Sequence, residues 1–194
     1  MRWKRSGKAL LIALSLFIAG QVHAAMMLQL DLQELTSRAD KIFRGTVIGV
    51  QEGTIEAGGG ELPTDTYRIA VDEMFKVEAT TVKGDQAVVE IRMVGSLEID
   101  KADENGNIRV SPFREVPRLS SGSDYVLFTT PESSIGLSMT VGLGQGAFRV
   151  YPVDGTDGAF MAVNEFNNAG LGINGDGPVE YDKLGAQIRA LLGQ

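Results

Sequence analysis

The sequence has no cysteine, one histidine and one tryptophan among its 194 residues. The histidine, His23, and the tryptophan, Trp3, both lie within the first 24 residues. Without that segment, the chain lacks the commonest general base, the thiolate nucleophile and the strongest side-chain ligands of transition metals. It also lacks disulfides, so apolar burial and hydrogen bonding must hold the fold together. These absences predict a protein with no catalytic centre, no cofactor and no metal.

Residues 1–24 have the three parts of a secretory signal peptide. Its basic residues are Arg2, Lys4, Arg5 and Lys8. An apolar segment, Ala9–Gly20, follows, and Val22-His23-Ala24 ends the segment as a cleavage motif before Ala25. The apolar segment is shorter than the roughly 20 residues of a membrane-spanning helix. We therefore expect export to the periplasm or the medium, no membrane anchor after cleavage, and one domain over residues 25–194. An uncleaved N-terminal anchor is the alternative.

Removal of the signal would leave a strongly acidic protein. Four of the 18 Lys and Arg lie in the signal, which leaves 14 against all 25 Asp and Glu, a formal charge of −11. Nucleic acids and anionic membrane surfaces both require clustered basic side chains. The negative charge therefore argues against nucleic acids and anionic membranes as partners. Its ordinary explanation is that it keeps the protein soluble.

Helical periodicity occurs near each end of the mature chain. Apolar spacing predicts a short helix over residues 31–38, with Asp31 and Glu34 as a capping-box pair. Residues Tyr181–Leu192 carry apolar side chains at helical spacing and predict an amphipathic helix, for which Asp182 is the expected N-cap.

Between these helices the patterns are those of strands. The predicted strands are Ile42–Val50, Thr66–Phe75, Gln86–Val94, Asp124–Thr129 and Thr140–Val153. Gly45 and Gly49 predict a bulge or a close backbone approach in the first strand. Glu52–Pro63, which contains Gly58-Gly59-Gly60, is predicted to be a mobile loop, and Asn105-Gly106 to be a hairpin turn. The number of strands and the short turns favour a mostly β fold, a small barrel, over a parallel α/β sheet.

The segment Gly142-Leu143-Gly144-Gln145-Gly146-Ala147 matches the dinucleotide-binding pattern G-x-G-x-x-G/A. That pattern binds a pyrophosphate only where a helix begins after the glycines. Here the strand-like Phe148-Arg149-Val150 follows instead. We interpret the three alternate glycines as strand residues that share one face and leave room for another element.

Two acidic features carry weaker hypotheses. Asp100–Asn107 resembles a calcium-binding loop, but counting from Asp103 places Ile108 and Arg114 where an EF-hand requires glycine and glutamate. A hairpin turn is the preferred interpretation, and weak calcium binding is the alternative. The carboxylates that could serve a glycan hydrolase are Asp72, Glu73, Asp103, Glu104, Asp154 and Asp157. A glycosidase requires two of them to face each other across a cleft.

Several motifs together suggest a family. They are Ala39-Asp40-x-Ile42-x-x-Gly45-x-Val47, Tyr67-x-Ile69-x-Val71, Asp124-Tyr125-Val126-Leu127-Phe128 and Val141-Gly142-Leu143-Gly144-Gln145-Gly146-x-Phe148-Arg149-Val150. Over nearly the whole mature chain the sequence resembles a family of uncharacterised exported bacterial proteins. Its first half more distantly resembles the OB-like barrel of netrin modules and tissue inhibitors of metalloproteinases. This resemblance implies a five-stranded Greek-key barrel with flanking helices. Those inhibitors chelate the protease zinc through a disulfide-anchored N-terminal cysteine, which this chain lacks.

These observations predict a non-catalytic exported module that binds another protein. One version is modulation of a secreted metalloprotease by a contact ridge made of the N-terminus and the predicted loop. The ridge residues would be Ala25, Met26, Met27, Gly58, Gly59, Gly60 and Glu61. The alternatives are a carboxylate-based glycan hydrolase and a structural component of an envelope assembly.

Overall fold

The computed structural model describes residues 28–76, 87–95, 116–156, 158–173 and 175–194. The predicted signal segment, Ala25–Met27, the Asp100–Asn107 loop with its Asn105-Gly106 turn, and Asp157 lie outside these residues.

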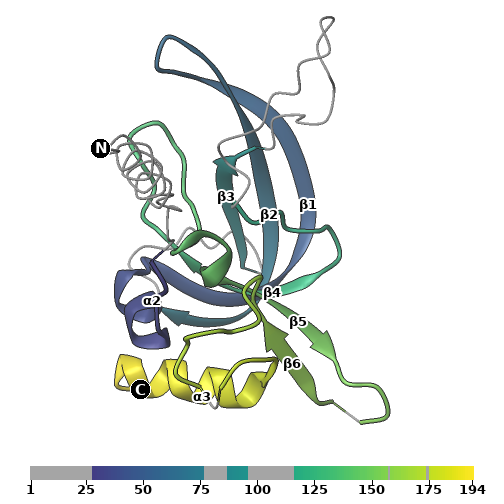
Figure 1. The fold of residues 1–194 in the computed structure, drawn as a ribbon. Helices are drawn as coiled ribbons and strands as arrows, with labels where there is room; N and C mark the ends of the chain where they lie inside the picture. Colours follow the sequence, from purple (N-terminus) through teal and green to yellow (C-terminus); the bar gives the residue numbers. More distant parts are fainter. Residues whose placement is uncertain (1–27, 77–86, 96–115, 157, 174) are drawn as a thin grey trace, which may run out of the picture.

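The described residues form one antiparallel sheet with the strand order β3-β2-β1-β4-β5-β6-β7 (Figure 1). The strands are β1 (Lys41–Ala57), β2 (Gly60–Lys76), β3 (Val88–Val94), β4 (Asp124–Thr129), β5 (Ala147–Pro152), β6 (Phe160–Val163) and β7 (Val179–Glu180). The mostly β prediction is confirmed. Closure into a barrel is not, because within the described residues the outermost strands, β3 and β7, do not pair with each other. A single backbone hydrogen bond, from Ser138 N to Arg92 O at 2.8 Å, joins β3 to the segment after β4.

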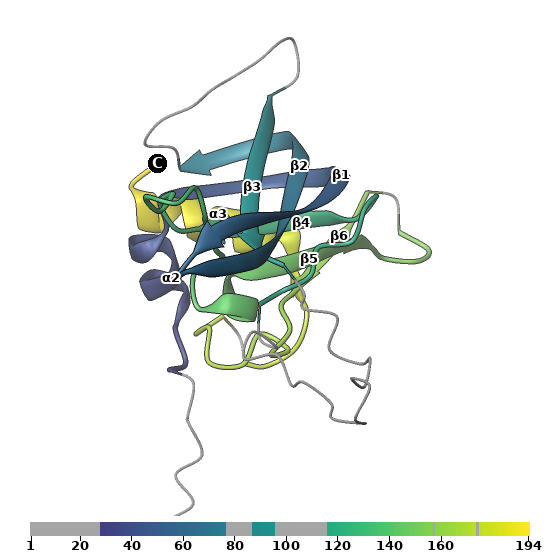
Figure 2. The same ribbon diagram turned by 90° about the horizontal axis from the view of Figure 1, so that it is seen from above.

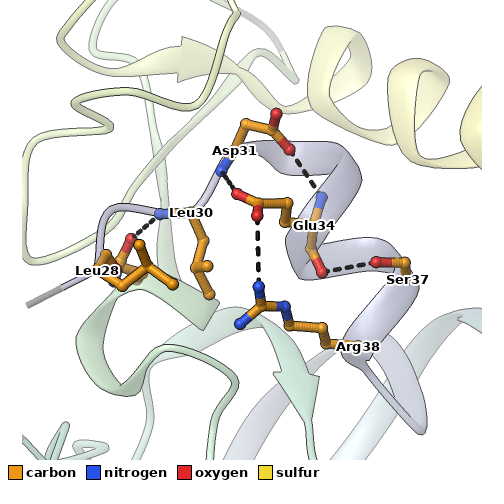
Figure 3. Close-up of polar contacts among 7 residues, drawn as sticks. Leu28, Leu30, Asp31, Glu34, Ser37 and Arg38 are labelled. Atoms are coloured by element: carbon orange, nitrogen blue, oxygen red, sulfur yellow. Dashed lines mark hydrogen bonds and ion pairs between the residues drawn. The ribbon is translucent and has the colours of Figure 1, made fainter.

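The short N-terminal helix is confirmed as α2 (Leu32–Arg38). Glu34 N donates to the Asp31 carboxylate at 2.7 Å, and Asp31 N donates to the Glu34 carboxylate at 3.1 Å (Figure 3). This reciprocal pair satisfies two backbone N–H groups that the first turn would otherwise leave open. Arg38 continues the network one turn later, 3.3 Å from Glu34.

The C-terminal helix is confirmed as α3 (Tyr181–Leu192). The expected N-cap, Asp182, is wrong, because Glu180 holds the cap position and makes no side-chain cap bond. Asp182 lies instead in the first turn, where a negative charge still favours the helix dipole. Leu184 and Ile188 are fully buried on the inner face. Figure 2 shows α3 beside α2, at one side of the sheet.

Two apolar clusters lie on opposite faces of the central strands. Ile42 and Phe128 belong to the cluster covered by α2 and α3. Their strand neighbours Phe43 and Leu127 belong to a second cluster with side chains of β2 and β3. Since neighbouring strand residues point to opposite faces, β1 and β4 are buried on both sides where they pair. This explains the almost continuous apolar sequence of β4.

The mobile loop predicted for Glu52–Pro63 is wrong. β1 and β2 remain paired from Ile42↔Lys76 to Ala57↔Gly60, and only Gly58 and Gly59 form the turn. Both glycines have positive φ, +63° and +82°, which a two-residue turn requires to match the twist of its strands. The run of three glycines therefore marks a tight turn rather than a loop.

The glycines predicted to interrupt β1 behave as expected. The register with β2 shifts between Arg44 and Gly45 and again between Val47 and Gly49. A Cβ on Gly45 would collide with the carbonyl oxygen of Ala70. Glycine at this position thus permits the close backbone approach.

The strand predicted for Thr140–Val153 is wrong in its first half. Gly142 adopts a left-handed conformation, and Leu143–Gly146 form a one-turn 3-10 helix, η1, before β5 begins at Ala147. The three glycines therefore do not alternate along a strand. A Cβ on Gly146 would collide with the Val141 carbonyl oxygen, so close packing of the turn on the preceding chain requires glycine there. Strands β6 and β7 were not predicted.

Candidate functional site

The distal half of the β1–β2 hairpin, Gln51–Asp65, extends beyond the two apolar clusters, and we call it the arm (Figure 1). Its side chains are exposed or half-buried except at Thr64. A two-stranded hairpin without an apolar face gains little stability of its own. The arm therefore contributes little to the core and presents a large surface to solvent.

All four charges of the arm are negative and lie on one face. The register places Glu52 opposite Asp65 and Glu56 opposite Glu61. Residues at alternate positions of paired strands share a face, so the four carboxylates form a single acidic face. Like charges directly opposite each other destabilise a strand pair. The arm has no Lys or Arg to offset them. Repulsion across the two pairs therefore reduces the stability of the hairpin.

The arm also borders a groove, whose lining includes Glu52 as well as uncharged residues of the opposite face. The groove, of about 430 Å³, is lined by Gly49–Thr54 of β1, Thr64, Thr66 and Arg68 of β2, and Glu90 and Arg92 of β3. Gly49 lies opposite Arg68, and a Cβ there would meet no atom within 4 Å. Arg68 and Glu90 form an exposed ion pair at 3.6 Å on the groove wall. The two glycines, Gly49 and Gly53, leave the β1 side of the groove bare.

Along the arm, no described residue pairs with the outer edge of β1. β4 pairs with β1 only from Lys41 to Thr46, and Val47 makes the last backbone bonds, to Gly122 and Ser123. From Ile48 to Ala57, no described residue forms a hydrogen bond with this edge. Ile48 and Val50, 49% and 43% exposed, lie at the beginning of the open stretch. An open edge of this length is a template for pairing with another strand.

The structure places part of the predicted contact ridge on the arm. Gly58 and Gly59 form its tip, and Gly60 and Glu61 begin β2. The N-terminal part of the ridge, Ala25–Met27, lies outside the described residues. The first described residue, Leu28, accepts a hydrogen bond from Gln145 of η1.

The glycine motif that contains Gln145 holds the N-terminal segment. The side chain of Gln145 is 4% exposed, accepts a hydrogen bond from Leu30 N at 2.7 Å and donates one to Leu28 O at 2.9 Å. Its amide thus pairs with the extended backbone before α2 as a neighbouring strand would. Asn164 donates to the backbone oxygen of Gln145 at 3.1 Å and fixes the turn from the other side.

The remaining residues of the motif are structural. Phe148 is fully buried and contacts Phe128, whereas Arg149 is exposed on β5. The carboxylate of Glu165 occupies the space that a Cβ on Gly144 would need. Burial raises the pKa of Glu165 above its ordinary value. A carboxylate against Gly144 would repel a phosphate at this turn.

A second polar group, which sequence reasoning missed, joins α3 to the sheet. Arg44 donates to Asp124, and its guanidinium lies 4.2 Å from the ring centre of Tyr181 and 4.7 Å from that of Phe160. Burial lowers the pKa of Arg44, but the hydrogen bond and charge of Asp124 outweigh it and leave that pKa raised. Tyr181 donates in turn to Glu73. The guanidinium of Arg44 is mostly buried and already occupied by Asp124 and the two rings, so its role is structural.

Of the carboxylates considered for glycan hydrolysis, Glu73 accepts hydrogen bonds from both Tyr181 and Arg189.

No three acidic or histidine side chains of the described ranges come together in a way that could hold a metal ion. In the same ranges, no helix has the length and apolar character needed to cross a membrane.

Neither the protein-family models nor the curated proteins compared with this sequence match it.

Proposed function

We propose that this chain is an exported, non-catalytic protein-binding module that contacts its partner through the arm. One observation carries the proposal: a long paired hairpin projects from the core with four carboxylates on one face, and no described residue pairs with its outer edge beyond Val47. Surfaces that reduce the stability of a fold are retained where binding uses them. The leader-like residues 1–24 support export.

The N-terminal mechanism of the metalloproteinase inhibitors has less support here. It depends on a cysteine-anchored amine, and the sequence contains no cysteine. If the partner is a secreted protease, the arm is the surface that the described structure offers for contact. No observation of the described residues favours a glycan hydrolase or an envelope component over protein binding.

A shortened arm provides the test. Ile55 and Leu62 lie directly opposite each other, two positions from the native closing pair of Ala57 and Gly60, so replacing Glu56–Glu61 by Asn-Gly keeps a two-residue turn and the pairing of β2 with β3. The shortened protein lacks the tip and one of the two acidic pairs. Intact and shortened proteins, each expressed from the full-length sequence with a C-terminal tag, are used to capture partners from periplasm and culture medium.

A partner recovered in stoichiometric amount by the intact protein and lost by the shortened one supports the proposal. Equal recovery by both proteins overturns the role of the arm. Recovery of no protein by the intact chain overturns the binding function itself. Circular dichroism and the melting temperature of both proteins establish that the shortened variant is folded.

A further inference from the structure

The open edge of β1 specifies how a partner would bind. Along a strand, alternate residues direct their N–H and C=O groups to the same edge. From Ile48 to Ala57 the groups at the outer edge have no protein partner among the described residues. An extended peptide can use them by adding itself as a further strand.

The two faces of the arm specify the side chains of such a strand. On one face, the added strand would lie beside Val50, Glu52 and Glu56. An apolar side chain would suit the position beside Val50, and basic side chains would suit those beside Glu52 and Glu56. On the other face it would lie beside Gly49 and Gly53, where bulky side chains can cover the bare backbone. The complementary segment therefore alternates between basic and bulky residues.

A second copy of this chain is a poor occupant. Two β1 edges related by a two-fold axis would run antiparallel and bring acidic face beside acidic face. Glu52 and Glu56 of each copy would then lie next to the same pair of the other copy. Like charges already oppose each other within the arm, and dimerisation would add to that repulsion.

We infer that the outer edge of β1, from Ile48 to Ala57, accepts an extended basic segment of a partner protein as an additional strand of the sheet. The inference rests on the proposed function and adds the binding mode and the chemistry of the segment. An acidic arm also increases the rate of encounter with a basic segment, and added salt should reduce that rate.

Synthetic peptides test the inference on the intact protein. The probe has about ten residues, with lysine alternating with valine or tyrosine. A second peptide carries glutamate in place of lysine, and a third keeps the lysines but is N-methylated at alternate backbone amides. Affinity is measured by calorimetry, and hydrogen exchange follows the amides of Ile48–Ala57.

The lysine peptide should bind at least about tenfold more tightly than either control and slow the exchange of alternate amides in this stretch. The double variant Glu52→Lys, Glu56→Lys should reverse the preference towards the glutamate peptide. It should also fold, because each new lysine would oppose Asp65 or Glu61. The double variant Asp154→Lys, Asp176→Lys makes the same charge change on exposed loops and should preserve the preference.

Equal binding of the methylated and unmethylated peptides would show a purely electrostatic contact and overturn strand addition. Absence of peptide binding at millimolar concentration would overturn it as well. If the captured partner is lost with the shortened arm but binds the Glu52→Lys, Glu56→Lys variant normally, the proposed function stands and this inference fails. If the shortened arm retains the partner, both fail.

Discussion

Arg44 donates two hydrogen bonds to one oxygen of Asp124, at 2.8 and 2.6 Å, and connects three elements through this pair. The two residues come from β1 and β4, and the guanidinium lies against the ring of Tyr181 at the start of α3. Both side chains are mostly buried, so solvent screens the pair only weakly. The ion pair therefore attaches the C-terminal helix to the centre of the sheet.

Substitution of Arg44 by lysine should reduce stability although it preserves the charge. Lysine lacks the planar fork that bonds Asp124 and the flat surface that stacks on Tyr181 and Phe160. We expect Arg44→Lys to lower the free energy of unfolding by about 1–2 kcal/mol, measured by urea denaturation. Arg149→Lys, on an exposed position of β5, is the matched control and should change it by less than about 0.5 kcal/mol. Equal effects would contradict the stacking argument.

Gln145 should be required to hold the N-terminal segment. Its side chain makes two hydrogen bonds to the backbone, one with Leu30 and one with Leu28. Gln145→Ala removes both and should destabilise the protein by about 2 kcal/mol. Gln145→Glu should cost more, because a carboxylate oxygen would then face the Leu28 carbonyl in a buried position. Hydrogen exchange of the Leu30 amide should increase in Gln145→Ala, which removes its acceptor, and unchanged protection in that variant would refute the role.

The sequence predicted those parts of the fold that depend on local patterns. The bounds of α3 and β4 agree with the prediction because helical periodicity and an apolar strand are local properties. The capping pair of Asp31 and Glu34 is similarly local. The arm was missed because Gly58-Gly59 was interpreted together with Gly60 as a loop, although a two-residue glycine turn is also a hairpin signal.

The candidate site depends on register and on distant partners, which one sequence does not reveal. Glu52 and Asp65 form a like-charge pair only because β1 and β2 align in one register. Gln145 contacts Leu30 across 115 positions of the chain. No local pattern contains such a contact. The mostly β fold was therefore predictable. The acidic face and the hydrogen bonds between Gln145 and the N-terminal segment were not.

Glu165 should make stability depend on pH. Burial raises its pKa in the folded protein, so the unfolded chain ionises first as the pH rises. The contribution of Glu165 to the free energy of unfolding is most favourable below the ordinary glutamate pKa of about 4.3. It is lost as the pH rises through the pKa of Glu165 in the folded protein. Glu165→Gln should therefore raise the melting temperature at pH 7 and leave it unchanged near pH 3. Glu132→Gln, on an exposed turn, is the control; a similar rise in that variant would contradict the assignment.

Tyr67 should resist ionisation in the folded protein. Its ring is buried, and burial raises the pKa of its hydroxyl to about 12. Since the unfolded chain ionises near pH 10, stability should fall between pH 10 and 12. Phenolate absorbance in the near ultraviolet should show a late component that Tyr67→Phe reduces. Burial also raises the pKa of Tyr181, so a double variant with Tyr181→Phe should lose more of this component. A titration complete by pH 11 would refute the prediction.

Substitution of Glu52 by lysine should increase stability and weaken binding of the lysine peptide. Replacing it by lysine converts the repulsive pair with Asp65 into an attractive one, and should raise the free energy of unfolding by about 0.5–1 kcal/mol. The same change removes a carboxylate beside the open edge of β1 and should weaken the lysine peptide severalfold. The control Glu61→Lys converts the other repulsive pair, with Glu56, from β2, one strand further from the edge, and should stabilise similarly but weaken binding less. A variant that lost both stability and binding would instead assign the carboxylate a structural role.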